Sequence, residues 1–489
     1  MSNRFLSGAI SGLAVVCVCT LISVVRGNEL EELLREAQES NPQVLAAKWK
    51  VEQALLSHEE LAEFFDPTFF AGVGKSEKAR AVPGGTNFTM LTNDSVDAQV
   101  GFEVPVTPGA YLSVGGANRM LLDPEGYDEL YQTMYGVQLR VPLLKDRGFK
   151  GLSLKRALAM ADYNANVSNL LKISQVMRRD IEIAYINAYE KLSSYRVTQE
   201  ATRRFLALYE ETQELSRLKV VPEYQIFESK MELQIGRDDE EKARANFELG
   251  LMDLAQKVGI DRRLALLGDQ KALLDAGNMY TSLQIVSEED ACMARGAYLE
   301  IRNGIQYAQA QIDISEEETR DNLDFELGLT AQGEHETNPL GMEDILTDRR
   351  MGYEVAVIWR RNLDYRGPKT RIARYRARIK ELNESLRLVR QQIRTEMLEA
   401  EMNFQAALKR LKLVREGIEA AKQNLASELE RFRLGENTSA DVTTAQKNLT
   451  TILQREVTAS ADLLRAHSNY IYAVGYYQPR PDDTAKKDK

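Results

Sequence analysis

Histidine is the side chain that most often serves as a general base or a metal ligand, and this sequence has only three, His58, His335 and His467. They are far apart in the chain. None is accompanied by a second ligand or a nucleophile at the spacing of a metal site or a catalytic triad. We therefore expect structural or surface roles for them, and predict that the chain is not an enzyme and uses no cofactor or metal.

A second chemical pattern, Gly72-Val73-Gly74-Lys75-Ser76, resembles the end of a phosphate-binding loop. That motif requires glycine where Phe69 stands and a helix after the serine, and the sequence supplies neither. Nucleotide binding is therefore not expected.

A third pattern is a run of basic residues that could suggest nucleic-acid binding. Its members are Arg360, Arg361, Arg366, Lys369, Arg371, Arg374, Arg376 and Arg378. The whole chain, however, has 63 basic and 73 acidic residues and a net charge of −10, so it is a poor ligand for a polyanion. A collar that faces solvent or a lumen is the better interpretation.

The N-terminus predicts export. Residues 1–27 contain Arg4 and then an apolar stretch from Ala9 to Val25, which is short for a membrane span and is typical of a secretory signal. An N-terminal anchor helix is the alternative. Removal of this segment would leave Cys292 as the single cysteine, so packing or oligomerisation must stabilise the chain in place of an internal disulfide.

Strands are predicted at about 67–142 and 322–361, where apolar and polar residues alternate. The clearest segments are Val96–Val104, Tyr135–Val141, Leu323–Leu329 and Tyr353–Trp359. A period of two gives one apolar and one polar face, and each segment is long enough to cross a bilayer as a tilted strand. An antiparallel sheet on a soluble core would alternate in the same way. The chain has too few strands to close a barrel alone, which favours a barrel shared by several copies.

Very long helices are predicted between and after the strands. Residues 152–218 contain no proline, and at 1.5 Å per residue they form a helix of roughly 100 Å. In the second half, apolar residues recur every seven positions at Met397, Phe404, Leu411, Ile418, Leu425 and Phe432. Small or β-branched residues follow three positions later at Ala400, Ala407, Val414 and Ala421. This heptad seam predicts a closely packed coiled coil.

Two interruptions predict the tips of helical hairpins. Near 433–441, Gly435 suits a left-handed helix C-cap, and Thr438 or Ser439 suits the N-cap of a returning helix. Near 218–223, Pro222 suits the first turn of the returning helix.

The order of elements predicts an internal duplication in an α+β chain. Residues 28–260 form the first repeat, 261–287 a connecting segment, 288–475 the second repeat, and 476–489 a polar tail. Each repeat has a helix, strands and a long helical hairpin.

The chain resembles the TolC-type outer-membrane efflux family over nearly all of its mature length. Asn41-Pro42, Phe65-Asp66-Pro67-Thr68-Phe69 and Val141-Pro142-Leu143-Leu144 carry the resemblance, with Pro67 and Pro142 at strand–helix junctions. The most specific segment is Arg431-Phe432-Arg433-Leu434-Gly435, followed by Asp441-Val442, Ala445-Gln446 and Leu449. The resemblance implies a homotrimer that shares a transmembrane β-barrel in the outer membrane and crosses the periplasm as a helical coiled-coil tunnel.

The resemblance also implies a function and a contact surface. Such a channel is the exit duct of an efflux or secretion system, and it works with a periplasmic adaptor and an inner-membrane pump. Its hairpin tips form the periplasmic entrance and touch the adaptor. In this chain those residues are Leu218, Val221, Pro222, Glu223, Phe432, Leu434, Gly435, Asn437, Asp441 and Thr444. The rival hypothesis is a periplasmic coiled-coil adaptor or scaffold, which would need only one hairpin.

Some family members close the entrance with acidic rings and a tyrosine–arginine–aspartate latch. Asp441 matches a ring aspartate, or it is a first-turn acid that favours the helix dipole; Thr444 stands where a second ring aspartate would be. The latch positions hold Phe432, Asn437 and Glu223. The latch is therefore not expected here.

The chain also departs from the family pattern in its strands. An extra strand pair, Val96–Val104 and Ala110–Gly115, either widens the barrel to six strands per chain or forms a separate extracellular hairpin.

Overall fold

The computed structural model describes residues 28–76, 95–122, 129–260, 280, 282–335 and 351–476. The predicted signal 1–27, nearly all of the predicted tail and most of the predicted connecting segment 261–287 lie outside the described residues. The chain divides into two compact units. A helical unit comprises the chain up to Trp49, residues 168–300 and the chain from Leu386 on, and a sheet unit comprises Lys50–Val167 and Ile301–Ser385.

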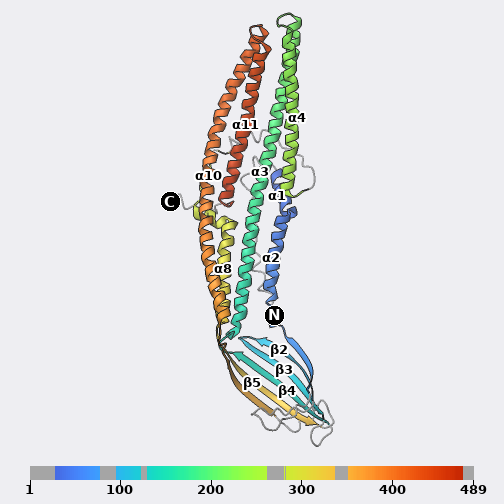
Figure 1. Ribbon diagram of the computed structural model, residues 1–489, viewed down its shortest axis with the longest axis vertical. Coiled ribbons are helices and arrows are strands. Elements are labelled where there is room, and N and C mark those ends of the chain that lie inside the picture. Colours follow the sequence, from blue (N-terminus) through green and yellow to red (C-terminus); the bar gives the residue numbers. More distant parts are fainter. Residues whose placement is uncertain are drawn as a thin grey trace. The chain divides into compact units, whose positions relative to one another are not determined.

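Two long hairpins contribute most of the helical unit (Figure 1). Helices α3 (Lys150–Arg217) and α4 (Tyr224–Val258) form the first, and α10 (Arg366–Arg433) and α11 (Ser439–Ala473) form the second. The first helix of each hairpin has 68 residues and the second has 35. These lengths confirm the predicted long helices. The predicted duplication itself stays a prediction.

The remaining helices are short. They are α1 (Asn28–Ser40), α2 (Pro42–Glu60), the 3-10 turns η2 (Glu63–Phe65) and η3 (Arg147–Phe149), α7 (Glu288–Ala294) and α8 (Gly296–Glu317). Among the described residues, every helix is too short or too polar to cross a membrane.

Each hairpin has its own apolar core. In the first, Ile181 of α3, Leu254 of α4 and Leu33 of α1 belong to one buried cluster. In the second, Phe404 and Leu411 of α10 pack with α11. The buried residues of α10 recur at the predicted heptad spacing, which confirms the seam.

α3 and α11 meet through both apolar and polar contacts, and Tyr189 of α3 shares a buried cluster with Val457 of α11. The Gln454 side chain accepts a hydrogen bond from Ser194 Oγ at 2.7 Å and donates one to the Ser194 carbonyl at 3.1 Å. Arg204 donates to Thr450 Oγ1 at 2.9 Å, and Arg465 donates to Asn187 at 2.8 Å. Hydrogen bonds of this kind, each of which typically contributes about 1 kcal/mol net, thus add to the apolar contact between the two hairpins.

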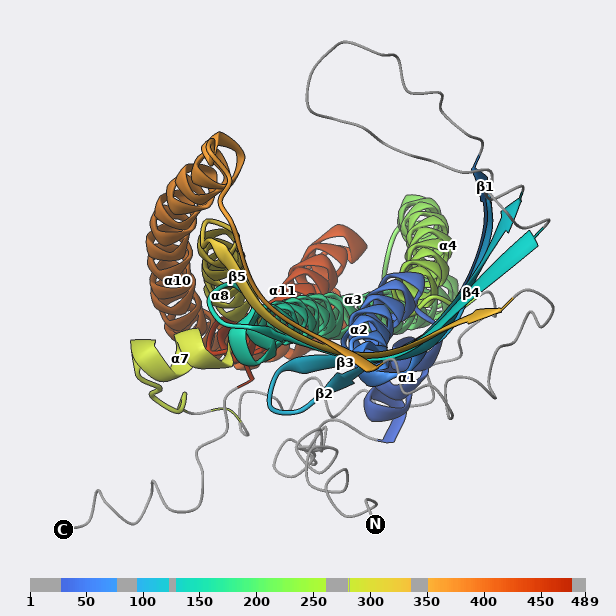
Figure 2. The same cartoon turned by 90° about the horizontal axis from the view of Figure 1, so that it is seen from below.

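The sheet unit contains one antiparallel sheet in the order β1-β2-β3-β4-β5-β6. Its strands are β1 (Thr68–Ser76), β2 (Ser95–Val106), β3 (Ala110–Leu122), β4 (Glu129–Pro142), β5 (Asn322–His335) and β6 (Met351–Arg360). Figure 2 shows that the sheet is strongly curved. The predicted extra strand pair forms β2 and β3 inside this sheet, so the sheet has six strands. The alternative, in which the pair forms a separate extracellular hairpin, is excluded.

An aromatic cluster closes the end of the sheet where the chain leaves for α3. Phe149 is buried, and its ring centroid lies 5.2 Å from Phe64, 5.7 Å from Phe65 and 5.5 Å from Tyr111. Pro67 precedes β1 and Pro142 ends β4 at this same end, as the sequence predicted for strand–helix junctions.

Gly296 provides a test of the helix packing. A Cβ at this position would lie 2.3 Å from the backbone nitrogen of Lys172, so Gly296→Ala forces α8 and α3 apart. We expect a cost of about 1–3 kcal/mol, seen as a lower melting temperature. Gly367→Ala is the control, because nothing lies within 4 Å of its Cβ. Equal melting temperatures for the two variants would contradict this packing.

Candidate functional site

The sheet carries a continuous row of exposed apolar side chains across all six strands. Successive members of the row are direct partners in the strand register: Phe69, Phe102, Val114, Val137, Leu329 and Tyr353. Direct partners in a sheet lie on the same face. Tyr353 is 82% exposed and Phe69 is 57% exposed. We call the face that bears this row the apolar face.

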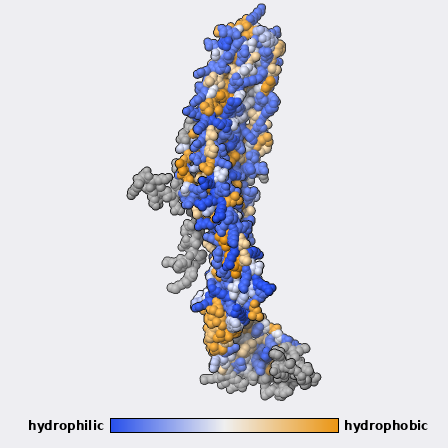
Figure 3. All heavy atoms as spheres, turned by 60° about the vertical axis from the view of Figure 1, so that its left-hand side comes forward, coloured by the Kyte–Doolittle hydropathy of each residue, from blue (hydrophilic) through white to orange (hydrophobic). Residues whose placement is uncertain are grey.

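Further exposed apolar residues lie on the apolar face at alternate positions of the same strands. They are Val73, Val100, Met351, Val355, Val357 and Trp359. Figure 3 shows hydrophobic side chains gathered over part of the sheet. A contiguous apolar surface of this kind marks a contact with lipid or protein.

Charged side chains lie on the opposite face, which we call the polar face. They are Asp97, Glu103, Arg119, Arg140, Asp324, Glu326, Glu354 and Arg360. Several form cross-strand pairs, among them Arg119 with Asp97 at 2.6 Å and Arg360 with Asp324 at 2.7 Å. Among strand residues with described side chains, only Lys75, next to the last residue of β1, brings a charge to the apolar face.

The histidines and the loop-like glycine segment show no catalytic arrangement. Gly72–Ser76 belongs to strand β1. The buried His467 packs against the Tyr280 ring at a centroid distance of 4.1 Å. Within the described residues, no three His, Cys, Asp or Glu side chains are grouped as a metal site would require.

The two hairpin tips have the same backbone turn. α3 ends at Arg217, and Lys219 then adopts a left-handed conformation with φ 59° while the Val220 amide donates to the Leu215 carbonyl. α10 ends at Arg433, Gly435 has φ 73°, and the Glu436 amide donates to the Arg431 carbonyl. The predicted role of Gly435 is confirmed. The turn at Lys219 could not be predicted from the residue type, because lysine seldom takes this conformation.

A buried cluster holds the two tips together. Val221 of the first tip packs with Phe432, Val442 and Leu449 of the second hairpin. Phe432 has no exposed surface and Val221 is buried. Both side chains thus pack within the chain, and their direct contact with an adaptor stays a prediction.

Polar contacts surround the tip cluster. Arg433 forms an ion pair with Glu211 of α3 at 2.6 Å, and Lys447 forms one with Glu232 of α4 at 2.7 Å. The Ser439 amide donates to Gln225 Oε1 at 3.1 Å in a buried hydrogen bond. Because these pairs join one hairpin to the other, they fix the relative position of the two tips.

Asn437 at a predicted latch position and Thr444 at the predicted second ring position have local partners. Asn437 donates to the Glu428 carbonyl at 3.2 Å, and Thr444 donates to the Ala440 carbonyl at 2.8 Å. Glu223 is the N-cap residue of α4, so Pro222 lies before the helix. The prediction that Pro222 occupies the first helical turn is therefore wrong.

Asp441 belongs to a capping box at the start of α11. Its carboxylate accepts hydrogen bonds from the Thr438 amide at 2.9 Å and the Thr438 hydroxyl at 2.7 Å. These bonds hold the pKa of the Asp441 carboxyl below its usual range. The structure thus gives Asp441 a helix-capping role, while a place in an acidic ring stays a prediction.

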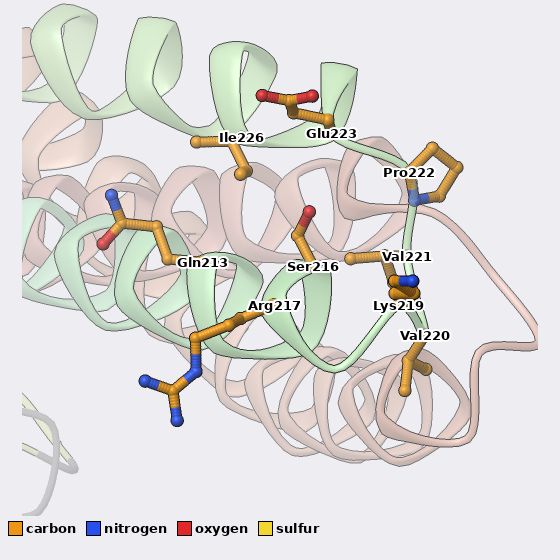
Figure 4. A pocket seen from close by; sticks show the side chains of 9 residues that line it. All are labelled: Gln213, Ser216, Arg217, Lys219, Val220, Val221, Pro222, Glu223 and Ile226. Atoms are coloured by element: carbon orange, nitrogen blue, oxygen red, sulfur yellow. The ribbon is translucent and has the colours of Figure 1, made fainter.

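Exposed apolar side chains remain at the outermost part of each tip. Leu218 is 66% exposed and Leu434 is 68% exposed, and each is the first residue after the long helix of its hairpin. Beside Leu218 lies an open hollow of about 670 Å³ between the ends of α3 and α4. Figure 4 shows Ser216 and Ile226 turned into this space and Arg217 turned away from it.

Phe432→Ala tests the tip cluster. Loss of a fully buried phenylalanine typically costs about 3–5 kcal/mol, so amide hydrogen exchange should accelerate around Val221 and Leu449, both neighbours of Phe432 in the cluster. Leu434→Ala is the control and should leave exchange unchanged, because its side chain is exposed. Unchanged exchange in Phe432→Ala would contradict the cluster.

The Asp441 cap makes a prediction about pH. Because the folded-state pKa is depressed, the cap is fully present above the usual aspartate value of about 3.9 and is lost as pH falls through the depressed pKa. Amides at the start of α11 should have equal protection factors at pH 6 and pH 5, where the protection factor is the intrinsic exchange rate at that pH divided by the observed rate. Protection should decrease as the pH falls below the usual aspartate value. In Asp441→Asn this acid-dependent step should disappear, and its persistence would assign the step to another group.

Solved structures of outer-membrane and channel-forming proteins share this fold. VceC of Vibrio cholerae is 13% identical, with 92% of this chain and 96% of that chain covered and a TM-score of 0.62. The open state of MtrE of Neisseria gonorrhoeae is 14% identical, with 91% and 88% covered and a TM-score of 0.63. CusC is 11% identical, with 92% of each chain covered and a TM-score of 0.63.

Sequence comparison alone finds less. No family model matches the chain, and no curated protein matches it. The fold is nevertheless shared over nearly the whole length of both partners in each structural pair. The predicted α+β class is confirmed, and the chain has the fold of the TolC-type outer-membrane efflux channels.

Proposed function

We propose that this protein is a trimeric outer-membrane channel, the passive exit duct of a tripartite efflux or type I secretion system. The sheet of each copy would contribute to one shared barrel in the outer membrane, and the helical hairpins would form a tunnel in the periplasm. The fold shared with outer-membrane channels supports the general class.

The two-faced sheet is the observation that carries the proposal. Its apolar face is exposed and its charged residues are gathered on the polar face. In a barrel wall, lipid would cover the first and water the second. The strands have 9 to 14 residues, which suits a tilted strand that crosses a bilayer.

The sheet edges support a closed assembly. β1 and β6 are the outermost strands, so one edge of each has no strand partner within the described chain. Unpaired backbone groups are very costly in lipid, and pairing β6 of one copy with β1 of the next would satisfy them. Three copies of six strands would give a barrel of about 18 strands, within the range of known outer-membrane barrels.

The tips support docking to a periplasmic adaptor. Leu218 and Leu434 are exposed at corresponding positions, and the hollow beside Leu218 offers room for a partner side chain. Phe432, Val221 and the ion pairs around them would keep this surface in shape.

Cell fractionation followed by unheated gel electrophoresis tests the assembly. We expect the protein in the outer membrane, extracted by detergent as a trimer that heat converts to the monomer. A periplasmic monomer would overturn the channel and would favour the adaptor or scaffold hypothesis.

Gly435→Pro tests the role of the tips. Proline cannot adopt φ 73° and lacks the amide that donates to the Phe432 carbonyl at 2.9 Å, so the second tip must rebuild. We expect export to be abolished while trimers still form. Gly435→Ala keeps the amide and should have an intermediate effect. Normal export by Gly435→Pro would contradict the assignment.

A further inference from the structure

An amphipathic collar lies at the end of the sheet where β4 and β6 lead into α3 and α10. The Asp321 carboxylate organises it. Trp359 donates its indole N–H to this carboxylate at 3.3 Å, Tyr365 donates its hydroxyl at 3.0 Å, and Arg361 Nε lies 3.9 Å away. Two aromatic rings and a guanidinium are thus fixed around one acid at the border of the apolar face.

Exposed leucines project from the same end of the sheet. Leu363, in the short connection from β6 to α10, is 96% exposed, and Leu143 and Leu144 are exposed just after β4. The connection after β4 lies next to residues 321–323, because the Leu143 amide donates to the Leu323 carbonyl and the Lys145 amide donates to the Asp321 carbonyl. Asp321 in turn accepts from Trp359 and Tyr365, on either side of Leu363. Water around these leucines is unfavourable, so an apolar environment is expected to cover them.

Exposed cationic side chains lie close to Leu363 in the sequence. Arg361 and Arg366 flank Leu363, with side chains 58% and 91% exposed, and Lys369 follows one turn later. The nearby acid Asp364 accepts from the Arg366 amide at 2.9 Å and so caps α10, with Arg366 Nε 3.3 Å from the same carboxylate. Arg361 and Arg366 thus remain largely exposed to solvent, although each also lies beside an acid of the chain.

We propose that this collar binds the phosphate groups of anionic phospholipids in the membrane leaflet nearest the helices. The inference rests on the proposed insertion of the sheet into a membrane. Leucines that enter the acyl region, an indole at the interface and cations at phosphate depth are the arrangement by which proteins hold a membrane boundary. The ligand would be a phospholipid such as phosphatidylglycerol, because free phosphate would leave the leucines and the adjoining apolar face in water.

The test is reconstitution into phosphatidylcholine nanodiscs that contain a minor fraction of phosphatidylglycerol. Spin-labelled lipids then report the preference for phosphatidylglycerol over phosphatidylcholine at the protein surface. We expect a clear preference in the unmodified protein. In the variant Arg361→Gln/Arg366→Gln/Lys369→Gln, the preference should fall by roughly fivefold for each charge removed.

A matched control removes three charges elsewhere. Lys230→Gln/Lys409→Gln/Lys412→Gln changes exposed lysines of the helical unit and should keep the preference. Equal preference in the collar variant and the unmodified protein would overturn the proposal. A preference abolished by millimolar inorganic phosphate would also overturn it, in favour of a general anion site. Failure of the unmodified protein to enter nanodiscs would instead overturn the membrane assignment.

Discussion

The free energy of the sheet depends on what covers its apolar face. Water there would surround a row of side chains that runs from Phe69 on β1 to Tyr353 on β6. At about 25 cal/mol per Å² of apolar surface, such a face strongly favours an apolar medium. The polar face favours water, since it carries ion pairs such as Asp97 with Arg119. A wall between lipid and water satisfies both faces. The edges of β1 and β6 that pair with no other strand of the described chain then call for further copies.

The helical unit meets a different requirement. Each hairpin buries an apolar core of its own, while α3 and α11 meet through hydrogen bonds such as those of Gln454 with Ser194 and through a small apolar cluster of Tyr189 and Val457. Water can replace such bonds at modest cost, whereas it cannot replace an apolar core. A larger apolar cluster around Phe432 joins the two hairpins at their tips.

Local patterns in the sequence predicted the features that depend on local physics. The absence of proline predicted α3, heptad spacing predicted the buried seam of α10, and Gly435 predicted the left-handed turn. Features that depend on contacts between residues far apart in the chain could not be predicted from local patterns. Whether β2 and β3 join the sheet depends on pairing with β1 and β4, and the burial of Phe432 depends on the meeting of the two hairpins. Lys219 was missed because its turn is fixed by backbone hydrogen bonds and by Val220, which packs beside Gly435.

Tryptophan quenching by brominated lipids tests the central claim most directly, because it reports which face of one strand meets lipid. The native Trp49 and Trp359 are first replaced by phenylalanine, and a single tryptophan is then placed at neighbouring positions of β6. Tyr353→Trp and Val355→Trp should be strongly quenched, whereas Glu354→Trp should be quenched by aqueous iodide instead. Equal quenching of all three by aqueous iodide, with no effect of brominated lipid, would contradict a membrane wall.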